Sequence, residues 1–162
     1  MIKIFSTGGT IDKIYFDAKS EFQVGEPLID EIFQDAYLTV AYEVESIMRK
    51  DSLDMTAKDR ALVRKKIELD PHRQVIVTHG TDTMVETGRA LLGIPDKTIV
   101  LVGAMQPASL RKTDAVFNIG FAVAAVQLLP IGVYIAMNGQ VFDPRTTTKN
   151  VAANRFEVVA ED

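Results

Sequence analysis

The sequence contains no cysteine and only two histidines among its 162 residues. Without cysteine the chain can form no disulfide bond, no thiolate nucleophile and no cysteine-bound metal site. The two histidines, His72 and His79, are also too few for the clusters that usually hold zinc or another transition metal. We therefore expect neither thiol chemistry nor a metal site in this protein.

An excess of positive charge and a long apolar run are absent as well. The 18 lysines and arginines are scattered and outnumbered by 22 acidic residues, so the net charge is −4 and no basic surface for nucleic acid is expected. The longest apolar stretch, 115–129, is interrupted by Asn118 and Gln127 and is too short to cross a bilayer. The first residues do not resemble a secretory signal. We expect a cytoplasmic protein that binds neither nucleic acid nor membranes.

What is present is the composition of a globular domain, with 47% hydrophobic and 25% charged residues. A single domain over residues 1–162 can enclose one core at this length. Apolar segments alternate with stretches of helical length, which is typical of a parallel sheet covered on both faces. Strands are predicted at residues 2–5, 38–44, 75–77, 98–102 and 131–137, and helices at 27–34, 56–69, 83–92 and 112–129. The pattern predicts an α/β fold: a doubly wound, mainly parallel sheet with helices on both faces.

Two segments allow more than one interpretation. Residues 11–26 lack a clear period and mix charges with Tyr15, Phe16 and Phe22, as expected for either a mobile lid or a surface hairpin. Residues 112–129 are apolar nearly all round the predicted helix. That helix is therefore either deeply buried or part of an oligomer contact.

Glycines and small polar residues follow the predicted strands. Because ligands bind beyond the carboxyl ends of parallel strands, these loops should meet at one edge of the sheet and form one pocket. Each loop alone has a simpler interpretation, such as a glycine turn, a helix cap, a structural histidine at His79 or a surface lysine at Lys149. Their shared placement favours a site. The loops are 7–10 (TGGT), 51–54 (DSLD), 79–82 (HGTD), 103–107 (GAMQP) and 143–149 (DPRTTTK).

The residue types in these loops limit the chemistry. With no cysteine and no serine–histidine pair, a nucleophile would have to be a hydroxyl, and threonine needs an adjacent base to become one. A lysine can act as that base where burial favours its neutral form. Thr81, Lys149 and Asp82 are therefore candidates for a proton relay. Backbone N–H groups at the Gly80–Thr81 turn are candidates for stabilising an oxyanion.

Several separated motifs resemble the bacterial-type L-asparaginase/glutaminase family, and the resemblance extends over essentially the whole chain. TGGTI at 7–11 and HGTDTM at 79–84 resemble its two signature motifs, and VGAMQP at 102–107, residues 114–118 and TTK at 147–149 follow in the family order. The resemblance implies hydrolysis of L-asparagine to L-aspartate and ammonia through an acyl-enzyme, without metal or cofactor.

The resemblance also implies roles for individual residues. Thr10 would be the primary nucleophile, with Thr81, Asp82 and Lys149 as the rest of the catalytic group. Ser52 would hold the substrate α-carboxylate, and Asp82 would also hold the α-ammonium. The remaining residues expected to line the substrate site are Gly9, Gly80, Ala104 and Met105.

Three departures from the family pattern affect these expectations. Family members run to roughly twice this length, with a smaller C-terminal domain that completes a neighbouring subunit's pocket, so we expect a short form without that domain. Leu53 stands where many members have glutamine. Phe22 occupies the position of the family's lid tyrosine, which leaves Tyr15 as the expected replacement.

An open pocket of this kind is expected to be completed by self-association, as a homo-oligomeric dimer or tetramer. Two other functions remain open. One is a non-catalytic binding or regulatory module for a small amino acid. The other is an amidase for a different small amide, or a subunit of a transamidation assembly. The presence of Thr10, Thr81, Asp82 and Lys149 together favours the enzyme.

Overall fold

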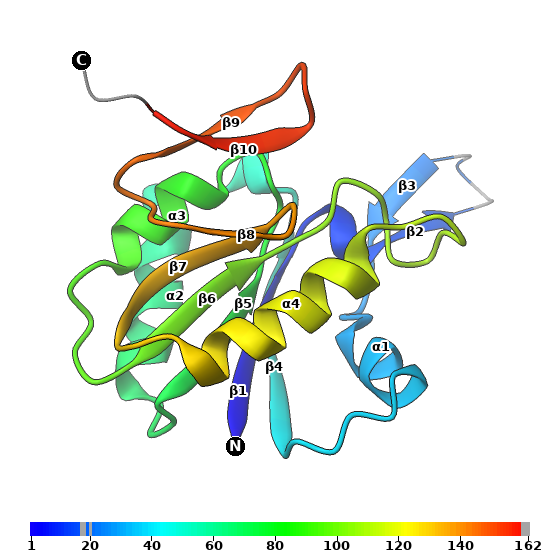
Figure 1. Ribbon diagram of the computed structural model, residues 1–162. Coiled ribbons are helices and arrows are strands. Elements are labelled where there is room, and N and C mark those ends of the chain that lie inside the picture. The colour runs from blue at the N-terminus through cyan, green and yellow to red at the C-terminus, as the bar shows by residue number, and fades with distance from the viewer. Residues whose placement is uncertain (17–18, 20, 160–162) are drawn as a thin grey trace.

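The structure is a computed structural model that describes residues 1–16, 19 and 21–159. Its centre is a six-stranded sheet of order β4-β1-β5-β6-β7-β8 (Figure 1). Five strands run parallel: β1 (Ile2–Gly8), β4 (Tyr42–Lys50), β5 (Gln74–Thr78), β6 (Thr98–Val102) and β7 (Gly132–Met137); β8 (Gln140–Phe142) is antiparallel to β7. The predicted doubly wound, mainly parallel fold is confirmed.

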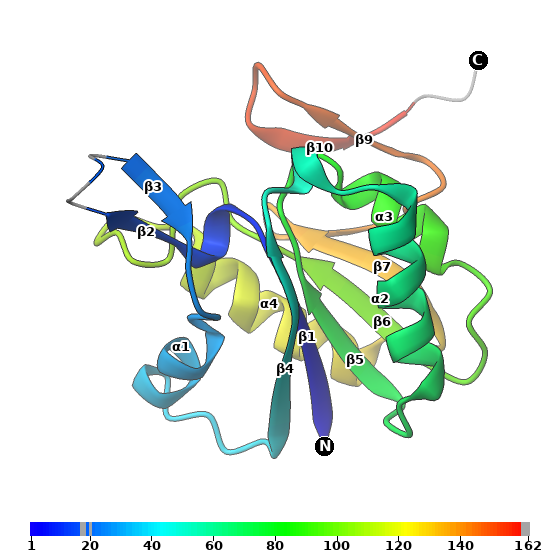
Figure 2. The same ribbon diagram turned by 180° about the vertical axis from the view of Figure 1, so that it is seen from behind.

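The strands are apolar because helices cover both faces. Every residue of β1 and β6 is buried, and in β5 only Gln74 at the start is not. Helices α2 (Ala57–Leu69) and α3 (Met84–Leu91) cover one face, and α4 (Ala115–Leu128) covers the other (Figures 1 and 2). Helix α1 (Ile29–Asp35) packs at the β4 edge, where the rings of Phe33 and Tyr42 meet edge to face.

The connection through α4 departs from the usual handedness. The chain moves one strand along the sheet in the same direction from β5 to β6 and from β6 to β7. Helices α3 and α4 nevertheless lie on opposite faces, so the two connections have opposite hands (Figures 1 and 2). In Figure 1 α4 lies in front of upward-pointing strands while the chain moves to the left, which makes β6–α4–β7 the rare left-handed form.

Some predicted boundaries were wrong. A strand over 38–44 was expected, but residues 38–41 are not in a strand and β4 continues to Lys50. Leu38 and Val40 are partly buried against the core, which produces the alternating pattern without strand pairing. The helix expected to begin at 112 starts at Ala115, whose N–H is bound by the Thr113 hydroxyl at 3.0 Å. The helix start at Thr56 is confirmed, because Thr56 and Asp59 form a reciprocal capping box.

Two hairpins rise from the carboxyl edge of the sheet. Residues 11–26 contain β2 (Lys13–Phe16) paired with β3 (Glu21–Val24), so the surface-hairpin interpretation holds for the described part of this segment. The second hairpin, β9 (Thr147–Asn150) with β10 (Arg155–Val158), was not predicted, because 143–149 was expected to be a loop. In Figure 1 both hairpins lie at the upper end of the sheet. None of the helices in the described part of the chain is long and apolar enough to span a bilayer.

Candidate active site

The strand order places the polar loops at the point where the chain reverses the direction in which it adds strands to the sheet. From β1 the chain goes first to β4 on one side and later to β5 on the other, so the carboxyl ends of β1 and β5 flank a topological switch point. Ligands in open α/β sheets bind at such points. Thr10 follows β1 and Thr81 follows β5, so the two expected threonines lie on either side of it.

Gly9 brings these two loops into direct contact. Its backbone has a φ of +92°, and a Cβ there would overlap the backbone nitrogen of Gly80. Only glycine combines this left-handed conformation with so close an approach. Its N–H donates to the Lys50 carbonyl at 2.9 Å, which also fixes the loop to the end of β4. Thr10, which follows Gly9, is half-buried. Thr81, which follows Gly80, is buried.

Gly80 makes a second close approach, to the loop after β4. A Cβ at Gly80 would lie 2.6 Å from the Ser52 hydroxyl oxygen. Ser52 is 1% exposed, and its hydroxyl has no hydrogen-bond partner in the described structure. A buried, unpaired hydroxyl costs free energy unless a ligand pairs with it. The Ser52 hydroxyl is therefore available as a hydrogen-bond donor beside the Gly9–Gly80 contact. The next residue, Leu53, is apolar and 71% exposed.

Lys149 reaches the site from β9 and joins two of the expected residues. Its Nζ donates to the Thr81 hydroxyl oxygen at 2.8 Å and to Asp82 Oδ1 at 2.6 Å. The lysine side chain is only 10% exposed, and the Asp82 side chain is 38% exposed. The β9 strand is held in place by Arg89 of α3, which donates to the carbonyls of Pro144 and Thr147. The Thr81 hydroxyl, the Lys149 amino group and the Asp82 carboxylate thus form one hydrogen-bonded chain.

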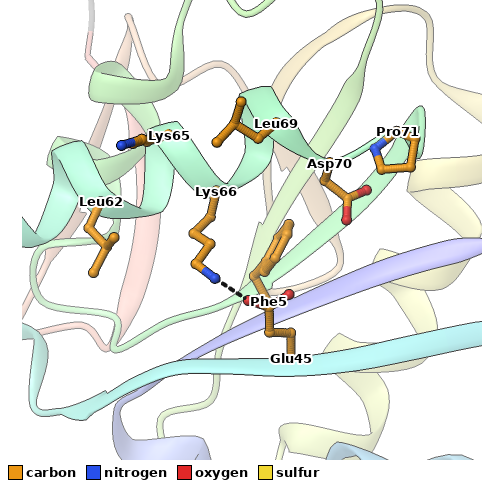
Figure 3. A pocket seen from close by; sticks show the side chains of 8 residues that line it. All are labelled: Phe5, Glu45, Leu62, Lys65, Lys66, Leu69, Asp70 and Pro71. Carbon is orange, nitrogen blue, oxygen red and sulfur yellow. Dashed lines mark hydrogen bonds and ion pairs between the residues drawn. The ribbon is translucent and has the colours of Figure 1, made fainter.

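An opening beside this chain connects it to solvent. A hollow of about 310 Å³ lies between α3 and the β9–β10 hairpin, and Asp82, Glu86 and Lys149 are among the residues that line it. A second hollow of about 390 Å³, between α2 and β4, lies away from these loops (Figure 3). Two of its charged groups already form the Lys66–Glu45 ion pair at 2.8 Å, and Asp70 is bonded to His72. It offers no comparable chemistry.

The loop after β6 is held by two residues for which no individual role was predicted. The Asp114 carboxylate accepts the backbone N–H groups of Met105 and Gln106 at 2.9 Å, and Asn118 donates to the Gly103 carbonyl at 3.0 Å. The Met105 N–H is therefore already occupied and is not free to bind a substrate. Ala104 is buried behind it at 1% exposure. Both residues belong to a braced loop, and their place in the substrate site stays a prediction.

His79 has a structural role. It is fully buried, its Nδ1 is 2.7 Å from the Gly80 carbonyl and its Nε2 is 2.7 Å from the Thr87 hydroxyl. Burial lowers the pKa of the imidazole from 6.5 to about 4, so the ring is neutral. In that state Nδ1 donates to the carbonyl and Nε2 accepts from the hydroxyl. The ring fixes the turn that presents Thr81.

Tyr15 lies apart from this group. It is on β2, its side chain is half exposed, and its ring packs edge to face on Phe22 at 5.5 Å. No hydrogen bond among the described residues joins it to Thr10, Thr81 or Lys149. Tyr15 and Phe22 are a cross-strand pair in the hairpin, so the expected lid tyrosine and the phenylalanine in its family position share one surface.

Comparison with known proteins identifies the family. The model of the asparaginase N-terminal domain matches residues 1–160. The chain belongs to the asparaginase family. It is 35% identical over 160 residues to L-asparaginase 2 of Escherichia coli, an alignment that covers 91% of this chain and 46% of that protein.

Solved structures of asparaginases share the fold. The thermostable L-asparaginase from Thermococcus kodakarensis superimposes with a TM-score of 0.84 at 24% identity over 99% of this chain and 52% of that one. A probable cytoplasmic L-asparaginase from Campylobacter jejuni gives 0.79 at 32% identity, over 97% and 51% of the two chains. The chain thus spans about half the length of the asparaginases it matches. No group of three metal-ligating side chains comes together in the part of the chain that the structure describes.

Proposed function

We propose that the chain is an amidohydrolase that converts L-asparagine to L-aspartate and ammonia, with Thr10 as the nucleophile. One observation carries the proposal: Lys149 Nζ bonds both the Thr81 hydroxyl and the Asp82 carboxylate, beside the Gly9–Gly80 contact that brings the Thr10 loop to the same place. Membership of the asparaginase family supports the same reaction class.

The reaction has two halves. The Thr10 hydroxyl oxygen attacks the side-chain amide carbon, and its proton passes along the Thr81–Lys149–Asp82 chain to the amide nitrogen, which leaves as ammonia. Water then attacks the acyl-threonine ester, gives one proton to the same chain, and releases L-aspartate while the Thr10 oxygen regains a proton. Backbone N–H groups at the Gly80–Thr81 turn face the developing oxyanion, and one such donor is commonly worth about 10²–10³ in rate.

The substrate's charged ends find partners at the rim of this site. The unpaired Ser52 hydroxyl donates to the α-carboxylate, and Asp82, which is 38% exposed at its side chain, accepts from the α-ammonium. Gly9 and Gly80 present backbone atoms beside Thr10 and Thr81, because their close packing leaves no space for a side chain at either position. Ala104 and Met105 close the far side, and Tyr15 reaches over the opening if the hairpin closes.

An ammonia-release assay on asparagine and glutamine tests the proposal. We expect Thr10→Ala, Thr81→Ala and Lys149→Met each to lower kcat by at least 10³ while the melting temperature changes little. Lys112→Met and Thr39→Ala are matched controls, because both residues are exposed and neither lines the hollow beside Lys149. Wild-type rates in Thr10→Ala would overturn the nucleophile assignment.

The same experiment separates the alternatives. Calorimetric binding of asparagine without ammonia release would indicate a non-catalytic amino-acid-binding module. Release from another small amide but not from asparagine would indicate an amidase of different specificity. We expect weak or no action on glutamine, because its extra methylene is usually discriminated against by about 1–3 kcal/mol.

The rest of the proposal concerns the assembly. We infer that this domain works in the cytoplasm as a homo-oligomer of two or four copies. The support is an exposed apolar strip on and after α4, where Val116, Phe117, Leu128 and Ile131 are 53%, 63%, 83% and 59% exposed. Large exposed apolar patches commonly mark such contacts.

A further inference from the structure

Asp12 is a buried carboxylate two residues after Thr10, and the mechanism gives it no role. The residue is 2% exposed. Its Oδ2 accepts from the Ser6 hydroxyl at 3.0 Å, and its Oδ1 accepts from the Leu28 backbone N–H at 3.1 Å. No cation of the described residues pairs with it, because the adjacent Lys13 bonds Asp51 instead. Burying a carboxylate without a pairing cation costs free energy, so we expect Asp12 to have a compensating structural or functional role.

The backbone of Asp12 adds two further bonds. Its N–H donates to the Gly9 carbonyl at 3.2 Å, which closes the short helical turn Thr10–Asp12. Its carbonyl accepts from the Gly25 N–H at 2.8 Å. One residue therefore contacts the end of β1, the turn that carries Thr10, and the chain that leaves the β2–β3 hairpin.

These bonds close the base of the hairpin. The hairpin stem begins at the Lys13–Val24 pair, and Asp12 bonds Gly25 and Leu28 immediately beyond it. If the hairpin swung at its base, it would have to break the bonds to Gly25 and Leu28. The Thr10 turn and the hairpin stem therefore move as one unit.

We propose that Asp12 is a positioning residue that locks the Thr10 turn to the base of the β2–β3 hairpin. Its kinetic consequence rests on the proposed amidohydrolase function, but the lock itself does not. Asparagine at this position can keep both side-chain bonds, since its Oδ1 accepts from Leu28 and its Nδ2 donates to the Ser6 oxygen. Alanine can keep neither.

Amide hydrogen exchange tests the lock without any need for activity. In Asp12→Ala we expect exchange at Leu28 and the hairpin stem to rise at least tenfold, while β5, β6 and α4 stay protected and report an intact fold. Asp12→Asn should stay within about threefold of the wild type. Unchanged exchange in Asp12→Ala, or an equal rise in Asp12→Asn, would overturn the proposal.

Kinetics with asparagine test the consequence. We expect kcat to fall at least tenfold in Asp12→Ala, with a smaller change in KM, and to be restored in Asp12→Asn. Ser6→Ala, which removes one of the two side-chain bonds, should give an intermediate loss and also covers the case in which Asp12→Ala fails to fold. If the wild type releases no ammonia, the proposed function fails and the exchange experiment still decides the lock. Normal kcat in an Asp12→Ala protein with raised exchange would refute the positioning role.

Discussion

At the scale of single residues, two buried titratable groups lie close to the threonines and respond to acid in opposite ways. Desolvation raises the pKa of Asp12 from 3.8 to about 6, and burial lowers the pKa of His79 from 6.5 to about 4. The Asp12 contribution to stability is full below pH 3.8 and is lost as pH rises through 6. The His79 contribution is full above pH 6.5 and is lost as pH falls towards 4.

Replacing Asp12 should leave His79 as the main source of pH-dependent stability among these two groups. We expect Asp12→Asn to raise the free energy of unfolding at pH 8 by up to about 3 kcal/mol, since two pKa units are worth roughly that much. The gain should shrink towards zero at pH 4. The variant should therefore lose stability more steeply in acid, because the protonation of Asp12 no longer offsets the effect of His79. Urea unfolding between pH 4 and 8 measures this. Asp35→Asn, at an exposed position, is the control, and a gain independent of pH would contradict the linkage.

At the scale of elements, close backbone contact between loops organises the site. We expect Gly9→Ala to abolish activity and to destabilise the fold by about 2 kcal/mol or more, because a Cβ would overlap Gly80 and the φ of +92° disfavours alanine. Gly120→Ala is the matched control, since nothing lies within 4 Å of its added methyl group. In helix α4 that change should stabilise by about 0.5–1 kcal/mol. Thermal melts and ammonia release on both variants check the prediction.

Gly80→Ala tests the second contact separately. The added methyl group would lie 2.6 Å from the Ser52 hydroxyl oxygen and displace the group proposed to bind the α-carboxylate. We expect KM for asparagine to rise at least tenfold. Ser52→Ala in the same assay should raise KM without the steric effect. An unchanged KM in both variants would remove Ser52 from the substrate site.

The elements also show which features sequence patterns can predict. Some features depend only on residues close together in the sequence, so hydrophobic periodicity and residue type were sufficient to predict them. These are the apolar strands β5 and β6 and the capping box of α2. The polar second half of β4 was missed because Glu45, Arg49 and Lys50 follow no strand pattern, and β9 was missed because threonines and a lysine resemble a loop. The Lys149–Thr81 bond spans 68 residues and was inferred from residue chemistry and family resemblance. Nothing local indicated that Asp12 would be buried.

At the scale of the whole molecule, α4 carries no charged residue and leaves part of its surface uncovered. We expect Phe117→Glu to shift the chain from oligomer to monomer in sedimentation velocity at micromolar concentration, because a charge in an apolar contact is unfavourable. Leu69→Glu, at a 74% exposed apolar site on α2, is the matched control. A wild-type protein that sediments as a monomer would contradict self-association through this face.

The position of β1 between β4 and β5 has a consequence for biosynthesis. Strand β1 is synthesised before both of its partners, β4 and β5, and Lys149 can reach Thr81 only after a further 68 residues have emerged. Parallel pairing of distant segments is slow, so the nascent chain passes through a long period without a closed sheet. The Lys149–Thr81 contact is therefore expected to form late, after the central strands have been synthesised.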